Sequence, residues 1–196
     1  YNNLQPLEKL KIPTDDVGDL PTFNQYALDK VQIILNKLDI KEFILFHPSA
    51  QYDYKIYPKH LRDQLLNLLN TIGIPILVTG ADNKFDVEIK ESLPILANIH
   101  NLIGKTTIEE YFALSYLSMA YLGMDTLNMH IAAVQNKRIF AIFGPTNLKM
   151  WAPWSNSLNV AATENNLIQT YGNVTIFQSA LPCAACGNSG CDNNGG

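Results

Sequence analysis

Residues 120–144, AYLGMDTLNMHIAAVQNKRIFAIFG, decide the fold class of this chain. The apolar run 120–124 predicts a buried strand that ends at Asp125 and Thr126. Residues 127–135 predict a helix, and a second apolar run, 138–143, predicts the next strand. Two strands joined by a helix of this length are typical of a parallel sheet.

The same alternation runs upstream of this stretch. Helices are expected over 22–39, over 83–92, from Pro58, and after Thr106 and Thr107, each of which has a glutamate three residues on. Strands are expected over 42–46, 74–79 and 99–103. Strand and helix thus alternate about five times, which predicts an α/β fold, a Rossmann-like open parallel sheet with helices on both faces.

Composition excludes several functional classes. Hydrophobic residues make up 47% of the 196 residues and charged residues 16%, as in globular proteins. A net charge of -4 provides no basic field, so no nucleic-acid partner is expected. No apolar run reaches the roughly 18–20 residues of a membrane span, and the first residues do not resemble a signal peptide.

The chain divides by composition into three parts. Residues 1–40 are expected to be a linker and a helix leading in from a preceding domain, and residues 41–180 the Rossmann-like domain. Residues 181–196, rich in Cys, Gly and Asn, are expected to be a flexible tail. All three cysteines, Cys183, Cys186 and Cys191, lie in this tail, which fits a protein of the reducing cytosol. Three cysteines are one short of a structural zinc site, so no metal site is expected.

Small and hydroxyl residues follow each predicted strand, at the edge where open α/β sheets bind ligands. These segments are 47–50, 79–82, 104–107, 125–126 and 144–147. A helix N-terminus at this edge suits phosphate, and Lys55 could add a full positive charge. The alternative is that small and hydroxyl residues simply form the loops and helix caps.

These segments also carry a family resemblance. His-Pro-Ser-Ala at 47–50 precedes Lys-Ile-Tyr-Pro at 55–58, and NLIGKTTIEE follows at 101–110. GMDTLNMHIAA at 123–133 and FGPT at 143–146 complete the set. In their order and spacing, over roughly residues 43–154, they resemble the C-terminal, donor-binding domain of glycosyltransferase family 9, the ADP-heptose:lipopolysaccharide heptosyltransferases.

The resemblance implies one half of a GT-B glycosyltransferase, in which two Rossmann-like domains face each other across a cleft. Residues 41–180 would bind a nucleotide-sugar, ADP-linked, as a substrate and not as a cofactor. The acceptor would be a lipopolysaccharide core or another lipid-linked glycan. Transfer would proceed with inversion and without a metal, and the catalytic base would lie on a missing N-terminal domain. Such an enzyme is cytoplasmic, with a peripheral position at the inner face of the inner membrane as an option.

The predicted substrate-binding residues follow from these motifs. They are Ser49, Lys55, Asp82, Lys105, Thr106, Asp125, Thr126, His130, Gly144 and Thr146. Asp125 and Thr126 would meet the sugar and the phosphates, and Lys55 phosphate or sugar. The alternatives are an ordinary helix cap for Asp125, a solvated Lys55 and a structural His130. His47 is interpreted as structural rather than catalytic.

Three residues depart from the family pattern. Leu127 stands where the family has glycine, Asn147 where it has aspartate, and Lys84 where it often has a ribose-binding glutamate. Asp82 is the acid nearest to that last position. Two alternatives to a transferase therefore remain: a nucleotide-binding module without catalysis, and another sugar-nucleotide enzyme such as an epimerase.

Overall fold

The computed structural model describes residues 22–179 together with Ala184 and Cys186. Residues 1–21 of the predicted linker lie outside the described part of the chain. Most of the predicted tail lies outside it as well, including Cys183 and Cys191.

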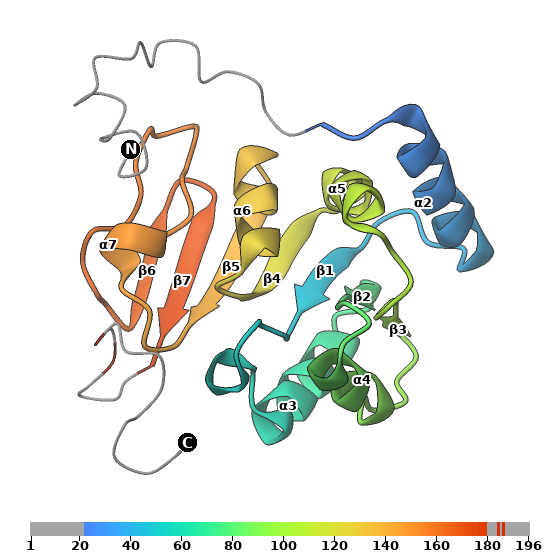
Figure 1. The fold of residues 1–196 in the computed structure, drawn as a ribbon, viewed down its shortest axis with the longest axis horizontal. Helices are drawn as coiled ribbons and strands as arrows, with labels where there is room; N and C mark the ends of the chain where they lie inside the picture. The colour runs from blue at the N-terminus through green and yellow to red at the C-terminus, as the bar shows by residue number, and fades with distance from the viewer. Residues whose placement is uncertain (1–21, 180–183, 185, 187–196) are drawn as a thin grey trace.

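A seven-stranded sheet forms the centre of the molecule, in the order β3-β2-β1-β4-β5-β7-β6 (Figure 1). The strands are β1 (Ile44–His47), β2 (Ile76–Val78), β3 (Ile99–Asn101), β4 (Ala120–Met124), β5 (Arg138–Phe143), β6 (Ile168–Tyr171) and β7 (Val174–Gln178). Every neighbouring pair is parallel except β6 and β7. The predicted α/β fold with an open parallel sheet is confirmed, except that the edge strand β6 runs antiparallel to β7.

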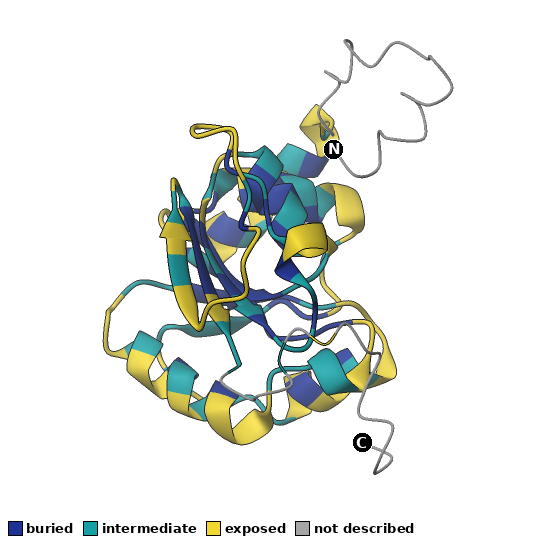
Figure 2. Ribbon diagram, turned by 90° about the vertical axis from the view of Figure 1, so that its left-hand side faces the viewer, coloured by how far each residue is buried: buried dark blue, intermediate teal, exposed yellow. Residues whose placement is uncertain are grey.

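Helices cover both faces of this sheet, as the alternating pattern predicted (Figures 1 and 2). On one face lie α2 (Gln25–Lys37), α5 (Ile108–Leu117) and α6 (Leu127–Val134). On the other lie α3 (Lys59–Asn70) and α4 (Lys84–Glu91). Two short helices, η1 (Asp53–Lys55) and α7 (Leu148–Trp151), follow β1 and β5. The helix α2 packs against α5 through buried Ala27, Val31 and Leu35, so it shares the domain's core.

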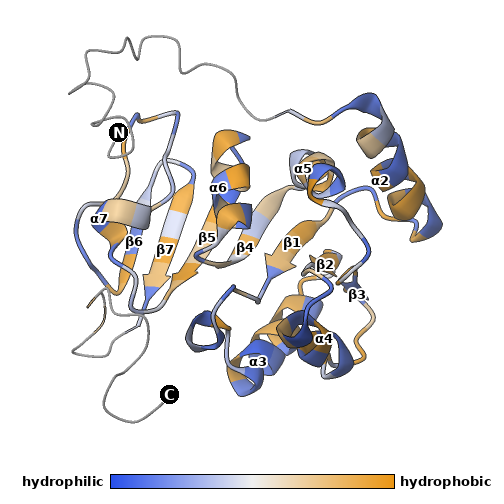
Figure 3. Cartoon of the chain, in the orientation of Figure 1, coloured by the Kyte–Doolittle hydropathy of each residue, from blue (hydrophilic) through white to orange (hydrophobic). Residues whose placement is uncertain are grey.

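The central strands are mostly apolar because both of their faces are covered. Leu45 and Leu77 face the core under α2 and α5. Phe46 and Val78, the next residues of the same strands, face the core under α3 and α4. Figure 3 shows the resulting hydrophobic strands between helices of mixed character. This double coverage explains why β1 and β2 appear in the sequence as continuous apolar runs.

The capping signal before α5 is realised at one of its two candidate positions. The Thr107 side chain accepts from the Glu110 backbone N–H, and the Glu110 carboxylate accepts from the Thr107 N–H at 2.8 Å. Reciprocal bonds of this kind fix the first turn of a helix. Thr106 directly precedes the N-cap residue and lies in the loop that follows β3.

The hairpin of β6 and β7 was not predicted from the sequence. Tyr171 pairs with Val174 across a two-residue turn, Gly172 and Asn173, and Gly172 adopts a positive φ of 51°. A Gly-Asn pair between two β-prone runs is a hairpin signal, so the sequence did contain the information. The hairpin adds an antiparallel edge strand to a sheet that was expected to be wholly parallel.

Gly123 allows β1 and β4 to approach each other closely, and we expect its replacement by alanine to destabilise the fold. An added Cβ would collide with the His47 carbonyl oxygen and lie 2.8 Å from the Tyr121 hydroxyl oxygen. Overpacking of this kind costs about 1–3 kcal/mol of unfolding free energy, measurable by urea denaturation. Gly144→Ala is the matched control, because nothing lies within 4 Å of its added Cβ. Equal midpoints for the two variants would contradict the close approach.

Candidate functional site

The strand order reverses between β1 and β4, and a cavity of about 510 Å³ opens at that point. The chain runs outward from β1 to β3 and then returns to place β4 on the other side of β1. At such a reversal the loops beyond the two strands diverge and leave a crevice. The loop after β1, the loop after β2 and the first turns of α5 and α6 line the cavity.

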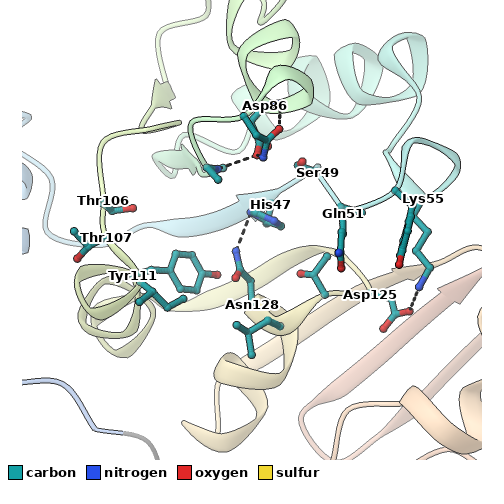
Figure 4. A pocket seen from close by; sticks show the side chains of 18 residues that line it. His47, Ser49, Gln51, Lys55, Asp86, Thr106, Thr107, Tyr111, Asp125 and Asn128 are labelled. Atoms are coloured by element: carbon teal, nitrogen blue, oxygen red, sulfur yellow. Dashed lines mark hydrogen bonds and ion pairs between the residues drawn. The ribbon is translucent and has the colours of Figure 1, made fainter.

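An ion pair closes one end of this cavity (Figure 4). Lys55 Nζ lies 3.1 Å from Asp125 Oδ2, with only 22% and 7% of the two side chains exposed. The helix η1 positions Lys55, and Asp125 directly follows β4. The N-cap of α6 is Thr126 and not Asp125, so the carboxylate is used for the ion pair instead of a cap. A half-buried lysine beside a helix start provides positive charge for an anionic ligand.

His47, at the carboxyl end of β1, lies in the middle of the cavity. Its Nδ1 lies 3.0 Å from Asn128 Nδ2 and 3.2 Å from Thr79 Oγ1. Burial lowers the pKa of His47 to about 4, against the opposing effects of the Asp86 charge and of a hydrogen bond with the Thr79 backbone. The imidazole is therefore neutral at physiological pH.

Asp86 is a buried acid in the cavity wall that the sequence analysis did not select. Its Oδ2 accepts from the Ala81 N–H at 2.9 Å and from the Asn83 side-chain amide. Its Oδ1 has no hydrogen-bond partner among the described residues, and neither has the buried Tyr111 hydroxyl. The signal for Asp86 was its place three residues after the N-cap Asn83, where a side chain turns back to the helix start.

The structure brings five of the ten predicted site residues to the cavity and leaves five elsewhere. Ser49, Lys55, Thr106, Asp125 and Thr126 line it. Gly144 lines a second, mostly apolar cavity of about 550 Å³ on the other side of Lys55. Asp82, Lys105, His130 and Thr146 line neither cavity.

The residues outside the cavities have local roles in the structure. Lys105 Nζ donates to the Asn101 carbonyl at 2.7 Å. Burial lowers the pKa of His130, against the opposing charge of Asp125. That Lys105 and His130 contact a ligand stays a prediction. Further residues line the cavity without having been selected from the sequence; they include His47, Gln51, Asp86, Tyr111 and Asn128.

Two departures from the family pattern now have a location. Leu127 is 60% exposed at the start of α6, on the rim of the cavity. Lys84 is the first residue of α4 and does not line the cavity, whereas Asp86, two residues on, does. The acid that lines this wall of the cavity is Asp86, and a ligand contact of Asp82 stays a prediction.

Within 22–179, Ala184 and Cys186, no three His, Cys, Asp or Glu side chains come together as metal ligands do. No helix in this part of the chain has the length and apolar character to cross a membrane.

The sequence model of glycosyltransferase family 9 (heptosyltransferase) matches residues 10–180. The chain belongs to this family. Lipopolysaccharide heptosyltransferase 3 of Escherichia coli K12 is 27% identical over 163 residues, covering 80% of this chain and 46% of the relative. Lipooligosaccharide heptosyltransferase 2 of Haemophilus influenzae is 29% identical over 168 residues, covering 78% and 48%. The family 9 chain thus spans about half the length of these relatives or less.

Solved structures share the fold of this family 9 chain. A family 9 glycosyltransferase from Veillonella parvula superposes with a TM-score of 0.64 at 16% identity, covering 74% of this chain and 43% of that one. The E. coli heptosyltransferase WaaC with ADP gives a TM-score of 0.62 at 17% identity, covering 92% and 51%. At these identities the likeness concerns the fold, a GT-B half, and not individual contacts.

Proposed function

We propose that this chain is the donor-binding part of a glycosyltransferase and holds a nucleotide-sugar in the cavity at the β1–β4 edge. The donor is ADP-heptose or a similar nucleotide-sugar, and it is a substrate and not a resident cofactor. The Lys55–Asp125 ion pair beside the first turn of α6 is the observation that carries the proposal. Residues 41–180 form the binding domain, and α2 covers its face.

The cavity suits the parts of such a ligand. Lys55 and the free N–H groups at the start of α6 offer positive charge to the diphosphate. Ser49 and Thr126 add hydroxyl groups to the lining. Thr106 lies at the end of the cavity away from Lys55 (Figure 4). The sugar would extend from the diphosphate past Asp125 toward the second cavity, which shares Lys55 with the first.

We further propose that transfer proceeds with inversion and that binding needs no metal. Lys55 and the α6 start already supply the positive charge that a divalent ion would otherwise bring to phosphates. The acceptor is a lipopolysaccharide core or a related lipid-linked glycan. Such an acceptor implies action in the cytoplasm at the inner face of the inner membrane.

Nucleotide binding by the 196-residue chain tests the proposal. ADP-heptose, ADP, UDP, GDP and CDP are added at millimolar concentration and the melting temperature is followed. A ligand at about 100 times its Kd should stabilise the fold by roughly 2.7 kcal/mol. The same titrations with EDTA and with added Mg²⁺ should give equal affinities. No shift with any nucleotide would overturn the donor-site proposal, and affinity that depends on Mg²⁺ would overturn its metal-free part.

A further inference from the structure

His47 has a fixed orientation of its ring nitrogens, which follows from the groups around Nδ1. A side-chain amide nitrogen carries two hydrogens and can only donate. Because Asn128 Nδ2 lies 3.0 Å from Nδ1, Nδ1 must accept. The Thr79 hydroxyl oxygen lies 3.2 Å from the same nitrogen and donates its hydrogen to the Phe46 carbonyl at 3.5 Å. A neutral imidazole whose Nδ1 accepts carries its single proton on Nε2.

The second nitrogen of His47 faces a different environment. The ring is 8% exposed, and it lines the cavity between Asp86 on one side and Asn128 on the other (Figure 4). The contacts with Asn128 and with the Thr79 hydroxyl both involve Nδ1 and leave Nε2 out. The Nε2–H group of a ring that lines a cavity can donate to an acceptor in a ligand.

The position of this N–H group indicates which ligand atom it meets. Asn128 is the second residue of α6, so His47 lies beside the first turn of that helix. The same turn begins next to the Lys55–Asp125 pair. A donor in this place lies near phosphoryl oxygens, which are strong acceptors.

We propose that Asn128 holds His47 as a neutral donor whose Nε2–H binds a phosphoryl oxygen of the nucleotide-sugar diphosphate. The inference rests on the proposed donor site and goes beyond it by giving His47 a contact with the ligand. Lys55 supplies the positive charge, and the neutral His47 supplies a directional hydrogen bond. Asn128 acts through His47 and is a positioning residue.

The protonation state can be observed directly in the unaltered chain. Nitrogen-15 NMR of labelled histidine at pH 7 should show the proton of His47 on Nε2 and a bare Nδ1. Saturating ADP should move the Nε2–H resonance downfield, as a hydrogen bond to phosphate requires. A proton on Nδ1, or an Nε2–H resonance that ADP leaves in place while it binds, would overturn the inference.

Two variants distinguish the hydrogen bond from Nε2–H from the contribution of the imidazole ring itself. His47→Leu should weaken ADP binding about 10-fold, because a hydrogen bond to a charged acceptor is lost. His47→Gln places an amide N–H near the position of Nε2 and should recover most of the affinity. Circular dichroism of both variants checks that they fold.

The outcomes distinguish the inference from the proposed function beneath it. Equal losses in the two variants, or no loss in His47→Leu, would overturn the role of His47 while leaving the donor site intact. Absence of ADP binding by the unaltered chain would overturn both. If neither variant folds, the NMR experiment still decides the question.

Discussion

Replacing Lys55 with alanine should weaken ADP binding by about 30- to 150-fold, close to 2–3 kcal/mol. The variant loses the cation that meets the diphosphate. It also leaves the Asp125 carboxylate, 7% exposed and 3.1 Å from Lys55 Nζ, without its partner and facing an anionic ligand. An unpaired, largely buried charge is costly, and part of the loss comes from this second effect. Isothermal titration calorimetry at fixed salt measures the change.

A second variant, Asp125→Asn, tests the direction in which the ADP affinity changes. Removing the carboxylate frees Lys55 and should tighten ADP binding a few-fold, the opposite direction to Lys55→Ala. In the double variant, Asp125→Asn should recover part of the affinity that Lys55→Ala loses. Lys59→Ala is the matched control, because Lys59 is an exposed lysine in α3 that pairs with Asp63 and does not line the cavity. Affinity of Lys55→Ala within twofold of the unaltered chain would contradict the placement of the diphosphate.

Much of the fold was predictable because local signals and global topology agree. Strands β1, β2 and β4 are buried on both faces, so they appear as apolar runs in the sequence. The box at Thr107 and Glu110 marked the start of α5. In the missed β6–β7 hairpin, the edge strand β6 has no buried residue and lacks such a run, whereas β7 has buried Val174, Thr175 and Ile176. Exposed edge strands carry weaker hydrophobic patterns than central ones.

The site was predictable where it depends on strand ends and not where it depends on helix rotation. Lys55 and Asp125 follow strands that neighbour each other, so topology alone brings them to one edge. Asp86 and Asn128 lie in the first turns of helices, and whether a side chain there faces the cavity depends on the helix's rotation. Tertiary packing sets that rotation, and a motif of strand-end residues carries no information about it.

Donor binding without transfer is the second large effect that we expect from this chain. We propose that the catalytic base and the acceptor surface lie outside these 196 residues. The curated relatives that support the family are about twice as long as the part this chain covers. A positioned base contributes typically 10²–10⁴-fold to such a step, and holding the acceptor in line contributes further. Turnover of ADP-heptose with a lipopolysaccharide-core acceptor should therefore not exceed the rate without enzyme.

The acids and histidines of the donor site support this expectation. Asp125 is paired with Lys55, and Asp86 accepts hydrogen bonds from the loop after β2. Burial keeps the pKa of His47 near 4, and a base that weak takes a hydroxyl proton poorly at neutral pH.

The assay follows ADP release by the 196-residue chain, with a full-length heptosyltransferase as the positive control. A thermal shift with ADP-heptose must accompany it, so that an inactive but donor-binding chain is distinguished from an unfolded one. Turnover by this chain comparable to the control would contradict the proposal that the catalytic base lies outside these 196 residues. The search for a base would then move to Asp53 in η1, which precedes Lys55 by two residues, and to His47 and His130.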